Sequence, residues 1–233
     1  MDHSARHHLT PHHLTPHHLT PHHLTPHRFT VCFDLDLTLV DTRPAVRAAY
    51  AALAAATGAY IDVDVAAGRI DLPLEQELRN WFPEDRVPWA RDLCVTGHPR
   101  HGITLSPALP GAREATGAVR ALGGRILVAT ARHSRSARLH LDHLGIASDV
   151  VEGSLWTEGR AVALRRYGAA VHVGDDAGDV HCARAAGALA VGVAGGICPA
   201  EALRSAGAQV VLPDLGHFPG WLRSRLGGPA PSM

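Results

Sequence analysis

The sequence predicts an α/β protein with a doubly wound parallel sheet and a second, small helical domain inserted after the first strand. Three observations support this fold class. From Pro110 onward, helix-period segments alternate with short β-branched runs; a separate apolar run occupies residues 29–33; and the stretch between them has a different, mainly helical texture. Strands joined through helices form parallel sheets covered on both faces, and ligands bind such sheets beyond the carboxyl ends of their strands.

The elements can be placed in order along the chain. The first strand is expected at residues 29–33, followed by a helix that starts after Thr42, with the threonine hydroxyl as its N-cap, and stops at Gly58. Short amphipathic segments with Trp81 and Trp89 then predict a small helical insert. The later strands are expected at residues 125–129, 149–152, 171–173, 189–193 and 209–212, and the later helices at residues 112–122, 134–144, 159–167, 179–186, 199–206 and 218–226.

These elements predict four parts of the chain. Residues 1–28 form a disordered, His-rich tail, and residues 229–233 a flexible C-terminus. The α/β core combines residues 29–41 with residues 107–228, and the helical insert spans residues 42–106.

The N-terminal tail contains four tandem copies of His-His-Leu-Thr-Pro at residues 7–26. A proline in every repeat prevents continuous helix, and the segment has too little apolar surface to fold alone. Its imidazoles are able to bind transition metals such as zinc, nickel or copper. We favour the alternative that it is a disordered repeat expansion or follows from a wrongly chosen start codon, because imidazole tracts bind metals whether or not binding serves a purpose.

Composition excludes several classes of function. The formal net charge is zero, which gives no reason to expect binding to nucleic acid or to a membrane surface. The chain contains no lysine, so a Schiff-base enzyme, a pyridoxal-phosphate enzyme and a P-loop are excluded. The four cysteines form no CxxC pair, and we expect core thiols in a reducing cytoplasm. No apolar run reaches the ~20 residues that span a bilayer, and no signal peptide is predicted.

Polar residues follow three of the predicted strands, where the sheet would place a site. Asp34 and Asp36 follow the first strand, Thr130 follows residues 125–129, and Asp175 follows residues 171–173. Two carboxylates as close as Asp34 and Asp36 must be neutralised, and a divalent cation is the usual means. The sequence therefore predicts a metal site at this edge of the sheet.

Four motifs in order carry a family resemblance. Asp34-Leu35-Asp36-Leu37-Thr38 matches DxDxT, Thr130 matches a Ser or Thr that ends a strand, Arg160 matches a basic residue at a helix, and Gly174-Asp175 through Asp179 matches GDxxxD. Over about residues 30–222 the chain resembles haloacid dehalogenase (HAD) superfamily hydrolases and is similar to phosphoglycolate phosphatases. The resemblance implies a HAD-like Rossmannoid core with a C1-type helical cap.

The resemblance also implies catalytic roles. Asp34 would be the nucleophile that forms an aspartyl-phosphate, and Asp36 the general acid and then the general base. Thr130 and the amides near Leu35 and Ala131 would hold the phosphoryl oxygens. Arg160 would offset negative charge there.

A magnesium ion is the cofactor that the resemblance implies. Mg²⁺ would be bound by Asp34, the backbone carbonyl of Asp36, and Asp175. Asp179 would orient Arg160 or a metal-bound water. Asp176 could replace Asp179 in either duty or simply cap the following helix.

Two features of the sequence depart from the family pattern. Leu37 stands where the first motif commonly has glycine, so different packing is expected beside the acid, and the third motif lacks the Lys-Pro of many phosphoglycolate-type relatives. The later histidines have no shared metal-ligand spacing, and we expect most of them to be surface residues or hydrogen-bonded core residues. Only His133 and His181 are expected near the site; the others are His140, His143 and His172.

The insert would close over the site as a cap and read the rest of the substrate. Its candidates for that role are Arg47, Arg79, Trp81, Arg91 and Arg100. The alternative, which we favour for any one of them, is that the tryptophans form the insert's own core and the arginines are solvated.

Together these observations predict a cytoplasmic, Mg²⁺-dependent phosphatase, monomeric or homodimeric, that acts on a small phosphorylated metabolite, with phosphoglycolate as the first substrate to try. Two alternatives stay open. One is a phosphotransferase or mutase acting on a sugar phosphate. The other is a metal-binding or interaction protein that acts through its His-rich tail.

Overall fold

The computed structural model describes residues 28–70, 72–97 and 101–226. The predictions for the His-rich repeat, for residues 229–233 and for Arg100 lie outside these residues. Within them, no helix is both long enough and apolar enough to cross a membrane. All four cysteines lie in the described part of the chain, and each is a free thiol.

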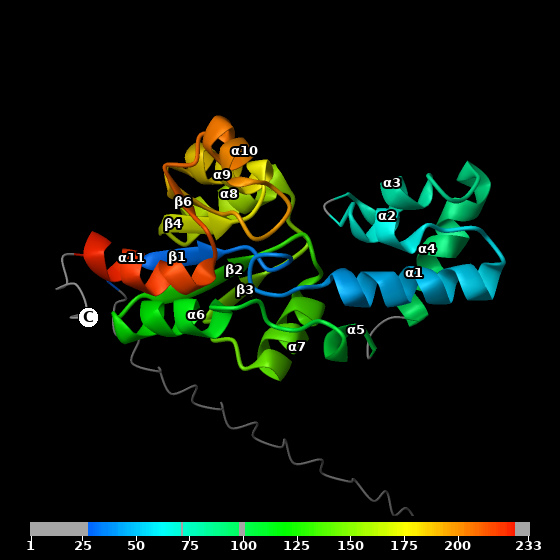
Figure 1. Cartoon of the computed structure of the whole chain (residues 1–233), viewed down its shortest axis with the longest axis horizontal. Helices are drawn as coiled ribbons and strands as arrows, with labels where there is room; N and C mark the ends of the chain where they lie inside the picture. The colour runs from blue at the N-terminus through cyan, green and yellow to red at the C-terminus, as the bar shows by residue number, and fades with distance from the viewer. Residues whose placement is uncertain (1–27, 71, 98–100, 227–233) are drawn as a thin grey trace, which may run out of the picture.

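A six-stranded parallel sheet forms the centre of the molecule, as predicted (Figure 1). Its spatial order is β3-β2-β1-β4-β5-β6, which places β1 beside both β2 and β4. The carboxyl ends of these three strands are therefore neighbours. The strands are β1 (Thr30–Phe33), β2 (Arg125–Ala129), β3 (Val150–Glu152), β4 (Ala169–Gly174), β5 (Leu189–Val193) and β6 (Val210–Leu212).

Helices cover both faces of the sheet, because side chains alternate along its strands. Val31 and Phe33 of β1 pack on one face with α6 (Ala112–Ala121), α7 (Ser134–Leu144) and α11 (Phe218–Arg225). Cys32 points to the other face, where α8 (Thr157–Arg166), α9 (Ala177–Ala186) and α10 (Ala200–Ala206) pack. Figure 1 shows these two helical layers below and above the strands, which confirms the doubly wound fold.

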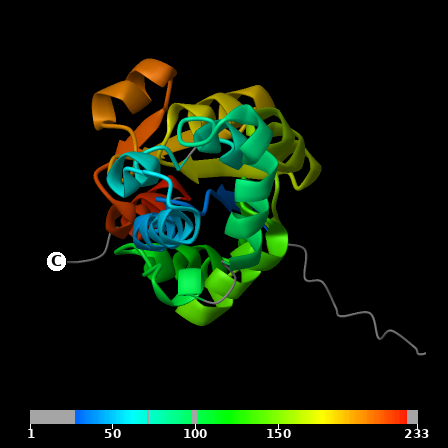
Figure 2. The ribbon, with the colours of Figure 1, turned by 90° about the vertical axis from the view of Figure 1, so that its right-hand side faces the viewer.

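Five helices follow β1 in the described residues; Figure 1 shows α1 to α4 to one side of the sheet, and Figure 2 looks at the molecule from that side. The segment from α1 to α4 encloses a hydrophobic cluster of its own that includes Tyr50, Leu53, Leu78 and Phe82, whereas α5 packs against α1 and α7. A mainly helical insert was expected here, and the described residues agree. The helices are α1 (Arg43–Thr57), α2 (Val63–Ala67), α3 (Leu74–Leu78), α4 (Val87–Gly97) and α5 (His101–Thr104), with a 3-10 turn, η1, at Glu84–Arg86; a second one, η2, covers Leu215–His217 before α11.

The start of α1 corrects one detail of the prediction. Thr42 precedes the helix, but its side chain makes no capping hydrogen bond, because its backbone is already helical (φ −92°, ψ −4°) instead of extended. The Asp41 carboxylate instead accepts a hydrogen bond from the amide of Arg43 at 3.2 Å. The predicted stop is confirmed, since Gly58 ends α1 with φ +70°.

Candidate active site

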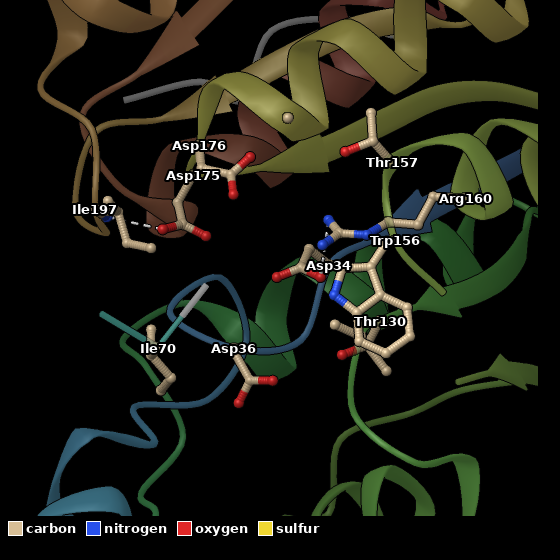
Figure 3. A pocket seen from close by; sticks show the side chains of 12 residues that line it. Asp34, Asp36, Ile70, Thr130, Trp156, Thr157, Arg160, Asp175, Asp176 and Ile197 are labelled. Carbon is tan, nitrogen blue, oxygen red and sulfur yellow. Dashed lines mark hydrogen bonds and ion pairs between the residues drawn. The ribbon is translucent and has the colours of Figure 1, made fainter. Parts of the chain in front are cut away.

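A cavity of about 240 Å³ lies at the carboxyl ends of β1, β2 and β4 (Figure 3). The predicted residues Asp34, Asp36, Thr130, Ala131, Arg160, Asp175 and Asp176 all line it, so the structure brings residues from four separate segments to one place. Its remaining lining residues are Ile70, Trp156, Thr157, Gly178 and Ile197.

The turn after β1 positions the first two acids. The Asp34 amide donates to the carbonyl oxygen of Val173 at 2.9 Å, which ties the strand end to β4. The chain then reverses, with the Val40 amide donating to Leu35 O at 3.0 Å. Leu37 lies in this turn with φ +60°, a left-handed conformation that costs a non-glycine residue about 1–2 kcal/mol. This backbone explains why glycine suits the position, and burial of the leucine side chain offsets the strain here.

Arg160 joins two of the predicted acids. Its Nη1 lies 3.4 Å from Asp34 Oδ1 and forms an ion pair with Asp179 Oδ1. All three side chains are largely buried, and Asp34 is only 6% exposed. Burial raises the pKa of Asp34 well above its ordinary value, and Asp179 and Asp175 add to the effect, while Arg160 offsets only part of it.

Asp175 is held by contacts on both of its carboxylate oxygens. Thr38 Oγ1 donates to Oδ1 at 2.7 Å, and the Ile197 amide donates to Oδ2 at 2.8 Å. Gly196 is required beside it, because a Cβ there would collide with the Asp175 side chain. Burial, with a further contribution from Asp179, raises the pKa of Asp175 to about 7.

Asp179 and Asp176 form a capping box at the start of α9. The Asp176 side chain accepts from the Asp179 amide at 2.7 Å, and Asp179 Oδ2 accepts from the amides of Asp175 and Asp176 at 3.1 and 3.4 Å. Two roles were predicted for Asp176, replacement of Asp179 or capping of the following helix, and these hydrogen bonds are those of a helix cap. Gly174 leaves room for the Asp179 carboxylate, which a Cβ at that position would meet.

His172 lies directly beneath the site, contrary to the expectation that only His133 and His181 would be near it. It is fully buried on β4, and its Nε2 lies 3.2 Å from Asp179 Oδ1. Burial opposes a charge on Asp179, but the contact with His172 and the charge of Arg160 outweigh it, and the pKa of Asp179 lies below its ordinary value. The sequence does not show whether a single histidine in an apolar strand is a core residue or a site residue. The pairing of β4 with β1 places His172 next to the acids of the site.

Three buried acids at the site fit a divalent cation. Carboxylate oxygens of Asp34, Asp175 and Asp179 all lie within 4.8 Å of one another, and all three residues are buried. Only Arg160 forms an ion pair with any of them among the described arginines. Raised pKa values at Asp34 and Asp175 mean that the ionised forms need a further positive charge, and hard oxygen ligands suit Mg²⁺. The residues present therefore fit the implied cofactor.

Arg132 is a site residue that the sequence did not assign, although it lies two positions after Thr130. Its Nη2 lies 2.6 Å from Asp36 Oδ1, and its Nε 3.3 Å from Oδ2. Burial favours the neutral form of Asp36, but this bidentate pair outweighs burial, and the pKa of Asp36 lies below its ordinary value. The sequence feature that could have indicated this pairing is a basic residue two positions after the strand-end threonine, since arginine binds carboxylates in a bidentate manner.

Thr130 is fixed rigidly at the end of β2. Its amide donates to Glu152 O and its carbonyl accepts from the Leu155 amide, both at 3.0 Å. By contrast, the amides of Leu35 and Ala131 hydrogen-bond to none of the residues that the structure describes. These two donors are the ones expected to hold phosphoryl oxygens.

The polar candidates of the insert lie elsewhere. Among the described residues, the only lining side chain from the insert is Ile70. The candidate arginines instead make exposed ion pairs with acids of the insert, which are Arg47 with Asp64, Arg79 with Glu84, and Arg91 with Glu75. The Trp81 indole donates a hydrogen bond to Glu77 Oε1 at 2.8 Å.

Acids and two arginines gather at the central strand ends of a doubly wound parallel sheet, which is where α/β enzymes of this architecture bind their ligands. A family model of haloacid dehalogenase-like hydrolases matches residues 30–187, and a HAD-hydrolase-like model matches residues 160–218. The chain belongs to the haloacid dehalogenase-like hydrolase family.

Individual relatives agree with this assignment. A relative named "Probable phosphatase IndB" from Dickeya dadantii (strain 3937) is 31% identical over 202 residues, which cover 78% of this chain and 88% of the relative. The haloacid dehalogenase-like hydrolase SP0104 from Streptococcus pneumoniae superposes with a TM-score of 0.74 at 18% identity, over 85% of this chain and 98% of the other. A predicted phosphoglycolate phosphatase from Haemophilus somnus has a TM-score of 0.68 at 16% identity, over 81% and 95%.

Proposed function

We propose that the protein is a Mg²⁺-dependent phosphatase that hydrolyses a small phosphomonoester through an aspartyl-phosphate on Asp34. The observation that carries the proposal is the buried cluster of Asp34, Asp175 and Asp179, in which Arg160 forms ion pairs with Asp34 and Asp179. A phosphomonoester brings further negative charge into this cluster, so binding needs both the arginine and a cation. Membership of the hydrolase family and the similarity to a relative named as a phosphatase support the same reaction.

In the first step, the Asp34 carboxylate attacks phosphorus and the bond from phosphorus to the ester oxygen breaks. The leaving alcohol takes a proton from Asp36. Asp36 lies two residues from Asp34, and its carboxylate is paired with Arg132. Because a general acid must carry the proton that it donates, Asp36 must take up a proton from solvent as substrate binds. The incoming phosphate dianion favours this, because a neighbouring negative charge raises the pKa of a carboxyl group.

In the second step, the Asp36 carboxylate takes a proton from water, and the resulting hydroxide attacks phosphorus. The bond to Asp34 then breaks and inorganic phosphate leaves. The Leu35 and Ala131 amides, Thr130 and Arg160 would hold the phosphoryl oxygens through both steps. Mg²⁺, held by Asp34, the Asp36 carbonyl and Asp175, would neutralise charge on the phosphoryl group and on the carboxylates.

We also propose that residues 42–106 act as a cap over the core formed by residues 29–41 and 107–228. Its support is the position of Ile70, which comes from this insert and lines the cavity. Closure would exclude water from the first step. The cytoplasmic location, the monomeric or homodimeric state, the lack of nucleic-acid partners and metal binding by the His-rich tail stay predictions from the sequence.

The experiment that tests the proposed function is a screen of small phosphomonoesters for phosphate release by the full chain, with Mg²⁺ and with EDTA. Phosphoglycolate belongs in the first set. Rapid acid quenching with a ³²P-labelled substrate should trap labelled protein in the wild type and none in Asp34→Asn. Activity that persists in EDTA, or label that persists in the variant, would contradict the proposal.

The same assay separates the two alternatives. A phosphotransferase would convert a hexose phosphate into its isomer without releasing phosphate, which product analysis detects. A protein that acts only through its tail would show no phosphatase turnover. If the proposed function is right, deletion of residues 1–28 should leave turnover unchanged and remove any binding of nickel or zinc.

A further inference from the structure

We propose that Trp156 is a specificity-determining residue that contacts the leaving group, and that this leaving group carries an uncharged ring, aromatic or sugar, in place of a second acid. The inference rests on the proposed phosphatase function and names the substrate class for the same site. It starts from an indole whose position the catalytic roles do not explain.

Trp156 is 50% exposed yet lines the cavity. Figure 3 shows its indole at the edge of the cavity, with the ring nitrogen turned inward. Within the described residues, no hydrogen bond involves this N–H. A large flat side chain that is neither in a hydrophobic core nor satisfied at its polar end is suited to contact a ligand.

The backbone of Trp156 is fixed to the groups that would hold the phosphoryl moiety. Its carbonyl accepts from the Arg160 amide at 2.8 Å, one turn along α8, and the preceding Leu155 amide donates to Thr130 O at 3.0 Å. The backbone of Trp156, from which the indole extends, therefore keeps a set position relative to the backbones of Arg160 and Thr130. A substrate anchored there by its phosphate presents its leaving group beyond that anchor.

Three of the larger lining residues are apolar and come from three distant segments, and Figure 3 shows Ile70 and Ile197 across the cavity from Trp156. Ile70 belongs to the insert, Trp156 precedes α8, and Ile197 follows β5; the latter two are substantially exposed. The charged lining residues all come from the core and surround the phosphoryl end; they are Asp34, Asp36, Arg160, Asp175 and Asp176.

Among the described residues that form the site, a second acid on the substrate would meet no arginine that is not already ion-paired. Arg160 is engaged with Asp34 and Asp179, Arg132 with Asp36, and the insert's ion-paired arginines do not line the cavity. The carboxylate of phosphoglycolate would thus add negative charge beside four lining aspartates. A ring instead buries apolar surface against Trp156 and adds no charge. The cavity, about 240 Å³, holds roughly eight waters at liquid density, which fits a small ring and not a polymer.

The test compares four esters that all leave as a primary alcohol: benzyl phosphate, glucose 6-phosphate, ethyl phosphate and phosphoglycolate. With Mg²⁺, kcat/KM for at least one ring-bearing ester should exceed both ringless esters by roughly ten-fold or more. The aromatic and sugar arms decide which ring is preferred. A preference for phosphoglycolate or ethyl phosphate would overturn the inference while leaving the phosphatase proposal intact.

Variants of Trp156 test its role directly. Trp156→Ala should lower the ratio of kcat/KM for the preferred ring-bearing ester to that for ethyl phosphate by roughly ten-fold, mainly through KM. Trp156→Phe should retain most of the ratio, and Trp156→Leu, which is apolar but not flat, should lose it. Trp89→Ala is the matched control, since Trp89 is 41% exposed and does not line the cavity.

An equal loss with all four esters, or no change in the ratio, would overturn the role of Trp156. The two proposals fail in different ways. If wild type and Asp34→Asn released phosphate equally slowly from every ester, the proposed function itself would be wrong.

Discussion

The edge of the sheet and the helical insert use charge in opposite ways. At the sheet edge, Asp34, Asp175 and Asp179 are buried together, Arg160 pairs with Asp34 and Asp179, and nearly every carboxylate oxygen has a fixed partner. In the insert, Arg47, Arg79 and Arg91 make exposed ion pairs, which contribute little to stability because solvent screens them. The only described side chain of the insert that lines the cavity, Ile70, is apolar. Under the proposed function, the charged residues of the core carry out the reaction, and the rim and the insert contact the group that is attached to the phosphate.

The largest effect is expected from the nucleophile. Asp34→Asn should reduce Mg²⁺-dependent hydrolysis of p-nitrophenyl phosphate by at least about a thousand-fold, because an amide cannot form the aspartyl-phosphate. The fold should remain, as judged by circular dichroism, since the substitution keeps the shape and removes charge repulsion. Undiminished turnover in the purified variant would refute the role of Asp34.

Arg160 is expected to come next. Arg160→Ala should lower kcat by about a hundred- to a thousand-fold, because it removes the positive charge that faces Asp34 and the phosphoryl oxygens. Arg166→Ala is the matched control on the same helix, since its side chain is 71% exposed and contacts only Glu152 at 3.9 Å among the described acids. If the two variants lost equal activity, the basic residue of the third motif would be misassigned.

The role of Asp36 as an acid predicts an effect that depends on the leaving group. In Asp36→Asn, formation of the labelled aspartyl-phosphate should slow by roughly a hundred-fold with ethyl phosphate and much less with p-nitrophenyl phosphate, because nitrophenolate leaves without a proton. The second step, in which Asp36 acts as the base, is common to both esters, so rapid acid quenching is used to follow the first step alone. Arg132→Ala should raise the pKa of Asp36, which Arg132 now holds low, and move the alkaline limb of kcat for ethyl phosphate to higher pH. Equal slowing of the first step with both esters would contradict the role of Asp36 as the acid.

Stability should depend on pH and Mg²⁺ through the acids at the sheet edge. The pKa of Asp175 is about 7 in the metal-free fold, above its ordinary 3.8, so the folded state holds its proton more tightly than the unfolded state does. Without Mg²⁺, the contribution of Asp175 to stability should be fully present below about pH 4 and be lost as pH rises to about 7, a change of up to about 4 kcal/mol that appears as the difference between the wild type and Asp175→Asn. Urea unfolding measures this change.

Added Mg²⁺ should stabilise more at pH 8 than at pH 5, because it favours the ionised acids. In Asp175→Asn both dependences should become shallower. A Mg²⁺ response of equal size at the two pH values would speak against binding by these carboxylates.

The smallest effect is expected in the insert. Arg91→Ala should change kcat/KM for the preferred ester by less than about two-fold, because Arg91 pairs with Glu75 at 2.6 Å in an exposed position and does not line the cavity. A ten-fold loss would show that the insert recognises substrate through charge, and would remove the contrast between the two regions.

The sequence by itself determined the sheet, the order of its elements and the acids of the site. Apolar periodicity fixed the strand and helix bounds to within a few residues, because that pattern is local. Asp34, Asp36, Thr130 and Asp175 could be predicted since each follows a strand, and parallel strands bring their carboxyl ends together.

The tertiary structure alone decided which side chains meet. Three features join segments far apart in the chain: the pairing of Arg132 with Asp36, the contact of His172 with Asp179, and the lining of one cavity by Trp156, Ile70 and Ile197. A basic residue, a buried histidine or an exposed tryptophan has many equally local interpretations. Long-range packing selects among them, because burial and partner distance depend on the whole sheet and not on neighbouring residues.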